Sequence, residues 1–254
     1  MKSCSFFLVL AITCAGNAVA ADHVKDILAD KMRYLSERFS TAAVNKSVID
    51  TITKADSAEL NFHKMVFTIV PRHPQSQNGT PQDYQLTLTL IHAGGPFVQS
   101  LDELSTNGFP SSMTYALSYR NAFFLDEQSV NLSAQDAASS YVVKNLKAFS
   151  AESMAENATG DFEWRYQMAP HIQIMNFKDT YYHCTYGASY EASVINFKLK
   201  GSAQDLSCDM RNDNNVVTSH VTVAKLPYYG ISIIRSRTST TSATDFTVTN
   251  VEID

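Results

Sequence analysis

Apolar and polar residues alternate along much of the chain beyond residue 60. In residues 84–90 the leucines share one face and the Gln and Thr side chains share the other, and residues 161–168 alternate in the same way. A period of two indicates β-strands with one buried face. Alternation, or a run of apolar and β-branched residues, predicts further strands at residues 60–70, 113–119, 172–186, 195–199, 206–210, 217–223, 231–234 and 246–253, the last with a bulge near Asn250.

Helical spacing is confined to three segments. Residues 22–39 predict an amphipathic helix, and residues 46–58 fit a second helix or a short strand, with the helix favoured. Residues 133–149 predict an internal helix, because Ser133 and Asp136 resemble a capping box before an apolar stripe. That stripe consists of Ala138, Tyr141, Val142, Leu146 and Phe149.

The order of these elements predicts the fold class. Consecutive strands joined by short turns favour antiparallel pairing, so we expect an α+β protein rather than a parallel α/β one. An N-terminal helix and one internal helix would pack on a mainly antiparallel sheet, with a β-rich C-terminal half. No Pro- or Gly-rich linker divides the chain, so residues 21–254 are expected to form a single domain, with 21–132 and 133–254 as alternative sub-halves.

The first 20 residues have the pattern of a secretory signal peptide. Lys2 precedes an apolar stretch of about 12 residues, and Ala18-Val19-Ala20 is a small-x-small cleavage site. A membrane anchor would need roughly 20 apolar residues. A lipoprotein signal centred on Cys14 is a weaker alternative, because Ala11-Ile12-Thr13 does not match the usual sequence before such a cysteine. We therefore expect an exported, soluble mature protein with no transmembrane segment, in the periplasm or otherwise in the extracellular space.

The charge of the mature chain argues against two classes of partner. Loss of Lys2 leaves 19 of the 20 basic side chains against all 25 acidic ones, a formal charge of −6, and no block of like charge stands out. Nucleic-acid binding requires clustered Lys and Arg, as does electrostatic docking on anionic membranes. Neither partner is expected.

Two of the four cysteines remain after the leader, Cys184 and Cys208. An even pair in an oxidising compartment favours a disulfide, which would close a loop of about 25 residues and stabilise the fold by roughly 3–4 kcal/mol. The alternative is a pair of buried free thiols.

Motifs for catalysis or cofactor binding are not evident. The seven histidines form no H-E-x-x-H or H-x-H pattern, and the chain has no C-x-x-C and no G-x-S-x-G. No metal or cofactor is expected. A hydrolase remains as an alternative, with His183 or His92 acting with an Asp or Glu from a distant position.

Aromatic residues are the remaining feature. Trp164 lies on an alternating strand, and Tyr181 and His183 lie on the next one, with parity opposite to that of Cys184. These three residues are candidates for an aromatic ligand groove, although core packing is the favoured explanation for aromatic residues on strands. The expected function is a binding or interaction protein for a small apolar ligand or a protein partner. A structural component of the cell envelope or of a secretion apparatus is a further alternative.

Overall fold

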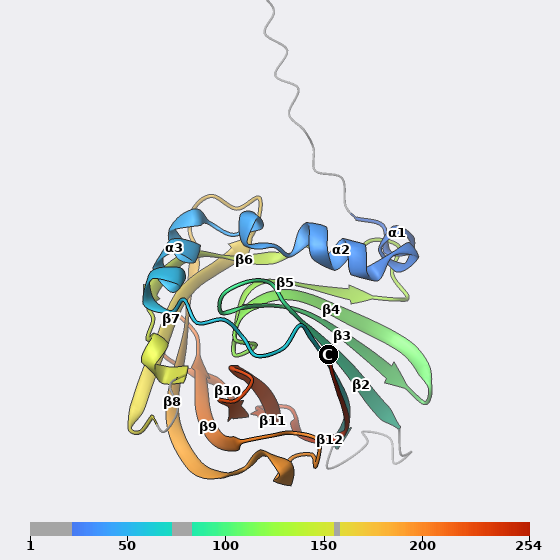
Figure 1. Ribbon diagram of the computed structural model, residues 1–254. Helices are drawn as coiled ribbons and strands as arrows, with labels where there is room; N and C mark the ends of the chain where they lie inside the picture. The colour runs from blue at the N-terminus through green and yellow to red at the C-terminus, as the bar shows by residue number, and fades with distance from the viewer. Residues whose placement is uncertain (1–21, 73–82, 155–157) are drawn as a thin grey trace, which may run out of the picture.

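The structure, a computed structural model, describes residues 22–72, 83–154 and 158–254. In this part of the chain, twelve antiparallel strands form a closed barrel in which each strand pairs with its neighbours in sequence, and β1 closes the ring with β12 (Figure 1). The strands are β1 (Lys64–Arg72), β2 (Tyr84–His92), β3 (Phe97–Thr106), β4 (Phe109–Tyr119), β5 (Phe123–Asn131), β6 (Tyr141–Ala148), β7 (Asp161–Pro170), β8 (Lys178–Glu191), β9 (Ser202–Arg211), β10 (Val217–Leu226), β11 (Ile231–Ser239) and β12 (Ala243–Ile253).

The predicted α+β class is wrong. Strands from before and after residue 132 belong to the same sheet, and its first and last strands pair from Met65–Ile253 to Arg72–Asp245. Closure removes both sheet edges, so the sheet curls on itself instead of lying flat under helices. Alternation along a strand shows that one face is buried. It does not show whether a helix or the far wall of a barrel covers that face.

The predicted internal helix at residues 133–149 is also wrong, because β6 occupies its second half. The register between β6 and β7 shifts twice, between Val143 and Asn145 and between Leu146 and Ala148. Each extra residue reverses the side-chain parity, which turned a strand pattern into an apparent helical spacing. The predicted strand at residues 195–199 is instead a turn that follows the 3₁₀ helix η3 (Ala192–Val194), and its Phe197 is exposed.

Strands β3 and β5 were not predicted. For β3 the burial pattern gives the reason. All five residues from Phe97 to Leu101 are buried, so this part of the strand has no alternation of buried and exposed positions. Other predictions are confirmed: residues 46–58 contain a helix, α3 (Lys46–Ala55), and β12 skips Thr249 where Thr68 pairs with Asn250 and Ile69 with Val248. The first predicted helix is divided into α1 (Val24–Ala29) and α2 (Lys31–Arg38) at Asp30, whose carboxylate accepts a hydrogen bond from the Arg33 backbone.

The helices lie against the outside of the barrel wall made by β3 to β6 (Figure 1). The rings of Tyr34 and Phe39 pack on Tyr115 of β4, with centroids 5.1 and 5.8 Å away. Gln99 of β3 donates to the Phe39 carbonyl at 2.8 Å. The short 3₁₀ helix η1 (Thr41–Ala43) joins α2 to α3, and η2 (Ala151–Met154) follows β6. This wall is therefore packed with large side chains on its outer face.

The turn between β4 and β5 ties this wall to the opposite one. Asn121 donates to the Ser232 carbonyl at 2.8 Å, and the Ser232 amide donates to the Arg120 carbonyl at 2.9 Å. The buried Arg120 guanidinium bonds both carboxylate oxygens of Asp56 and the carbonyl of Gly230. Gly230 has φ +72°, and a Cβ there would lie 2.5 Å from Arg120 Nη1, so this close approach requires glycine. These contacts join β11 to the β4–β5 turn.

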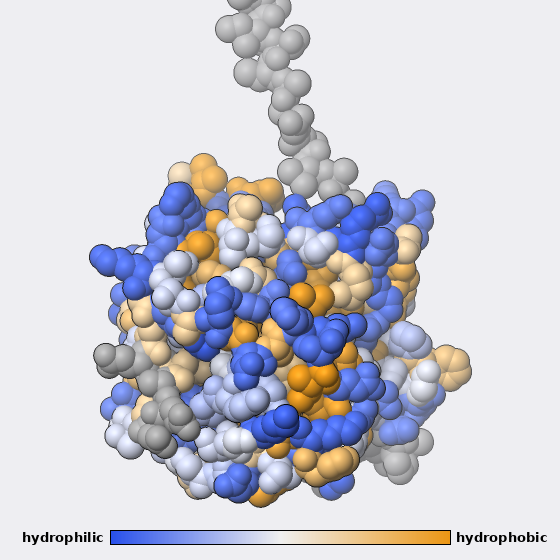
Figure 2. All heavy atoms as spheres, viewed as in Figure 1, coloured by the Kyte–Doolittle hydropathy of each residue, from blue (hydrophilic) through white to orange (hydrophobic). Residues whose placement is uncertain are grey.

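The visible surface mixes hydrophilic and hydrophobic residues, with hydrophobic ones gathered in a short strip near the centre of this face (Figure 2). In the described ranges, no helix has both the length and the apolar character needed to cross a bilayer.

Candidate functional site

A cavity of about 360 Å³ lies inside the barrel and is the best candidate for a functional site. Its wall is contributed by eight strands and by the turn before β5, and most of the lining is apolar or aromatic. The lining residues are Leu86, Leu88, Asp102, Asn121, Ala122, Phe124, Glu127, Trp164, Tyr166, Met168, Thr180, Tyr182, Leu206, Cys208, Met210, Val221, Val223, Ile234 and Arg237.

The two faces of β4, which lies between β3 and β5 in the barrel, differ in side-chain size. The outer face of β4 carries Met113, Tyr115, Leu117 and Tyr119, and its inner face carries Ser112, Thr114, Ala116 and Ser118. The inner assignment follows from pairing, since Thr114 lies directly opposite Asp102 and Ala116 directly opposite Glu127, and both acids line the cavity. Because the helices cover the outer face, the large residues pack there and small ones remain inside.

Asp102 is the most unusual group in the cavity. Its Oδ1 atom is buried and has no hydrogen-bond partner among the described residues. Burial raises the pKa of Asp102 from its ordinary value of 3.8 to about 7, and the negative charge of Glu127 adds to the effect. Asp102 keeps some accessible surface although it lies deep in the barrel, because that surface faces the cavity.

Glu127 and Arg237 complete the charged part of the lining. Burial raises the pKa of Glu127, while the positive charge of Arg237 acts in the opposite direction. Arg237 comes from β11, where it pairs with Val221 of β10, so the acids and the arginine belong to different walls of the barrel. The site thus combines an apolar enclosure with three charged groups.

Aromatic side chains form another part of the lining. Tyr166 and Tyr182 are stacked, with ring centroids 6.2 Å apart and planes at 13°. Trp164, the single tryptophan of the chain, packs beside them at 3% exposure, with its indole 5.6 Å from the Phe123 ring. Burial raises the pKa of the Tyr182 hydroxyl, which therefore stays protonated at neutral pH.

The three residues of the predicted aromatic groove do not come together. Trp164 faces the cavity. Tyr181 is on the outer side of β8, under the guanidinium of Arg165 at 4.5 Å, and His183 is on the same side, 3.7 Å from the carboxylate of Asp161. One predicted residue therefore belongs to the cavity and two lie on the outer surface.

Sequence reasoning missed Asp102, Glu127 and Arg237. Asp102 and Glu103 stand together as a pair of acids in the sequence, but adjacent strand residues face opposite sides. Glu103 points outward, where it forms an ion pair with Lys31 of α2. The alternation that would have separated the two is absent in β3, so the sequence carries no clear signal for the inner acid.

Cys184 and Cys208 lie opposite one another on β8 and β9 and are joined by a disulfide in the structure. Cys208 also contributes to the cavity wall. The bridge therefore connects two strands that line the site.

The histidines named for a hydrolase do not line this cavity. His92 bonds the Gly95 carbonyl at 3.0 Å and lies 2.9 Å from the Glu59 carboxylate. A further pair, His171 and the buried Asp126 at 2.9 Å, belongs to the outer face, because Asp126 pairs with Leu117. In the ranges that the structure describes, no group of three or more His, Cys, Asp and Glu side chains could hold a metal ion.

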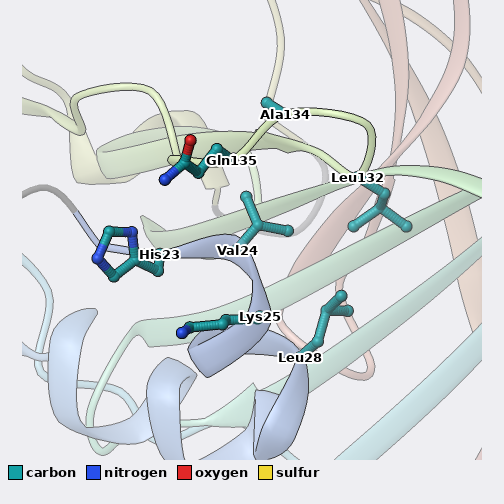
Figure 3. Close-up of a pocket in the computed structure, with 7 residues that line it drawn as sticks. All are labelled: His23, Val24, Lys25, Leu28, Leu132, Ala134 and Gln135. Atoms are coloured by element: carbon teal, nitrogen blue, oxygen red, sulfur yellow. The ribbon is translucent and has the colours of Figure 1, made fainter.

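A second pocket of about 350 Å³ lies at the surface between α1 and the loop after β5 (Figure 3). Val24, Leu28 and Leu132 line it together with His23, whose ring is hydrogen-bonded to Asp136 at 2.5 Å. The Val24 amide also donates to the Gln135 carbonyl at 3.0 Å. This hollow follows from the docking of α1 on the loop, and its His23 ring is already paired with Asp136, so it is the weaker candidate.

No protein-family model matches the chain, and no curated protein sequence matches it. Among solved structures, the chain is similar to a β-barrel-like protein of the domain of unknown function DUF1849 from Brucella abortus, with a TM-score of 0.48 and 8% sequence identity over 78% of this chain and 99% of that one. The fold described above stands on the strand pairing of this chain itself.

Proposed function

We propose that this chain is an exported binding protein that holds a small, largely apolar ligand inside its barrel. The supporting observation is the internal cavity, whose volume of about 360 Å³ falls in the range usual for small-molecule sites. Such sites combine an apolar wall with a few polar groups that orient the ligand. Here Asp102, Glu127 and Arg237 are those groups.

The burial of polar groups supports binding over simple packing. A core that exists only for stability satisfies or excludes most of its polar atoms. Asp102 is neither excluded nor satisfied, and it borders the open space of the cavity. This arrangement lowers stability unless a ligand completes it, which is the usual compromise at a binding site.

Export rests on the leader pattern of residues 1–20 and on the cysteine pair, with the periplasm as the expected compartment and the extracellular space as the alternative. Mass spectrometry of the denatured mature protein tests this part. We expect a mass that starts after Ala20 and lies two daltons below that of the reduced chain. An intact leader in the secreted or periplasmic fraction would contradict it.

Ligand binding is tested with the neutral apolar dye N-phenyl-1-naphthylamine. We expect its fluorescence to rise in the cavity and the emission of Trp164 to fall, because the indole lines the same space. Val221→Phe should reduce dye binding by filling the cavity. Val216→Phe is the matched control, because Val216 is 56% exposed in the turn before β10.

Equal dye binding by the wild type and both variants would place the dye elsewhere and contradict the proposal. Native mass spectrometry of protein purified from its exporting host gives an independent check. A small-molecule adduct lost on denaturation is expected, and Val221→Phe should carry less of it than Val216→Phe.

A protein partner is the second candidate, and one observation favours it. The turn between β7 and β8 exposes Ile172, Ile174 and Met175 at 78, 80 and 62%, respectively. Three exposed apolar side chains within four residues are typical of contact surfaces. Replacing Ile172 and Ile174 with Ser would weaken a protein complex and leave dye binding unchanged, whereas Val221→Phe would do the reverse.

A further inference from the structure

Asp102 leaves one hydrogen-bonding requirement in the cavity unmet. Its Oδ1 atom is buried without a donor among the described residues. A buried acceptor without a partner is uncommon in folded proteins, since it has given up its bonds to water. A donor on a ligand would supply the missing bond.

The charges in the cavity are unbalanced. Asp102 and Glu127 lie diagonally across the small inner face of β4, and Arg237 is the basic side chain of the lining. Within the described part of the chain, neither carboxylate has a Lys, Arg or His at ion-pair distance. Two acids against one base leave room for one further positive charge.

The aromatic residues favour the same ligand chemistry. The faces of Trp and Tyr rings attract cations, and Trp164, Tyr166 and Tyr182 line the cavity together with the two acids. A carboxylate ligand would instead have Arg237 as its single basic partner in the lining and would be repelled by the negative charges of both acids. The lining therefore discriminates between a cationic and an anionic head group.

We propose that the ligand is an amphipathic amine, whose protonated amino group binds Asp102 and Glu127 while its apolar body packs on the leucines, valines and aromatic rings of the barrel. This inference rests on the proposed ligand-binding function and names the ligand class of the same site. Asp102 accepts at its free oxygen, Glu127 supplies the second negative charge, and the aromatic wall surrounds the chain of the ligand.

The proposal carries a pH dependence, because Asp102 must be ionised to bind a cation. The titratable and charged groups that line the cavity with it are Glu127 from β5, Arg237 from β11, and Tyr166 and Tyr182 from β7 and β8, and the charge of Glu127 raises the pKa of Asp102 further. With the pKa of Asp102 at about 7, its ionised fraction increases about tenfold from pH 6 to pH 8. Amine affinity should rise by about the same factor, and the affinity for a neutral ligand should not.

Displacement of N-phenyl-1-naphthylamine by octylamine, octanol and octanoate tests the proposal, because the three share a chain and differ in the head group. In the full mature protein at pH 8 we expect octylamine to bind at least about tenfold more tightly than octanol, and octanoate to bind least tightly. Asp102→Asn should abolish the preference for octylamine and preserve octanol binding. Glu127→Gln should reduce the preference for octylamine in part. This second variant tests the proposal if Asp102→Asn is poorly folded.

Asp213→Asn is the matched control, since Asp213 is exposed in the turn between β9 and β10 and should leave every affinity unchanged. Binding of octanol without a preference for octylamine, or a preference that survives both Asp102→Asn and Glu127→Gln, would overturn the amine assignment alone. Failure of the dye and all three competitors to bind would overturn the ligand-binding function itself.

Discussion

Asp102→Asn should make the protein more stable at alkaline pH, although it removes a charged residue from the surroundings of a proposed site. Asn has nearly the shape of Asp and cannot ionise. The carboxyl binds its proton more tightly in the folded state, where its pKa is about 7, than in the unfolded chain, where 3.8 applies. Its contribution to the free energy of unfolding is therefore most favourable below pH 3.8, declines as the pH rises to about 7, and stays constant above that.

The magnitude follows from the distance between the two pKa values. Each pH unit between them is worth about 1.4 kcal/mol, so ionised Asp102 lowers the stability at pH 8 by about 4 kcal/mol relative to pH 4. Asp102→Asn removes this difference. For a chain of this length, that corresponds to a rise in Tm of roughly 10 °C at pH 8, with little change at pH 4.

Urea unfolding of the wild type and the variant at pH 4, 6 and 8 measures the effect directly. The informative quantity is the difference between the two proteins as a function of pH, because the carboxyl groups other than the coupled Glu127 contribute equally to both. Asp213→Asn should run parallel to the wild type at every pH, since this side chain is exposed. Glu127→Gln should shrink the effect of Asp102→Asn, because the charge of Glu127 contributes to the raised pKa of Asp102. A variant that is destabilised at pH 8, or a stability difference that does not change with pH, would refute the reasoning.

Two further predictions concern the bonds that hold the barrel together. Replacing Cys184 and Cys208 together with Ala should lower the free energy of unfolding by about 3–4 kcal/mol, because the bridge spans a sequence separation of 24, and a reductant should then no longer shift the thermal transition. An unchanged transition in the wild type under reducing conditions would contradict this. Asp56→Ala should lower the free energy of unfolding, measured in urea, by about 3–5 kcal/mol. It leaves the Arg120 guanidinium, whose side chain is 9% exposed, without its carboxylate partner. Asp50→Ala breaks an exposed ion pair as the control and should cost less than about 1 kcal/mol, so equal losses in the two variants would rule out the buried pair as the cause.

Local patterns in the sequence determined much of the secondary structure. Residues 84–90 and 161–168 alternate because one face of each strand is buried, and both segments lie within strands of the barrel. The parity change in residues 246–253 reveals the bulge at Thr249, because a strand must gain one residue to keep its apolar side chains on one face. These features depend on near neighbours in the chain, so the sequence alone is enough to predict them.

Tertiary structure decided the closure of the sheet and the location of the cavity. β1 and β12 meet although almost the whole described chain separates them, and no local pattern encodes that pairing. It also decided that the large residues of β4, such as Tyr115, face the helices and not the inside of the barrel. Asp102 and Glu103 are neighbours in sequence, yet one faces the cavity and the other meets Lys31 on the outside. The register of a strand decides which of its side chains face the cavity. Where both faces of a strand are covered, the sequence does not alternate and does not reveal that register, so it does not reveal the candidate site.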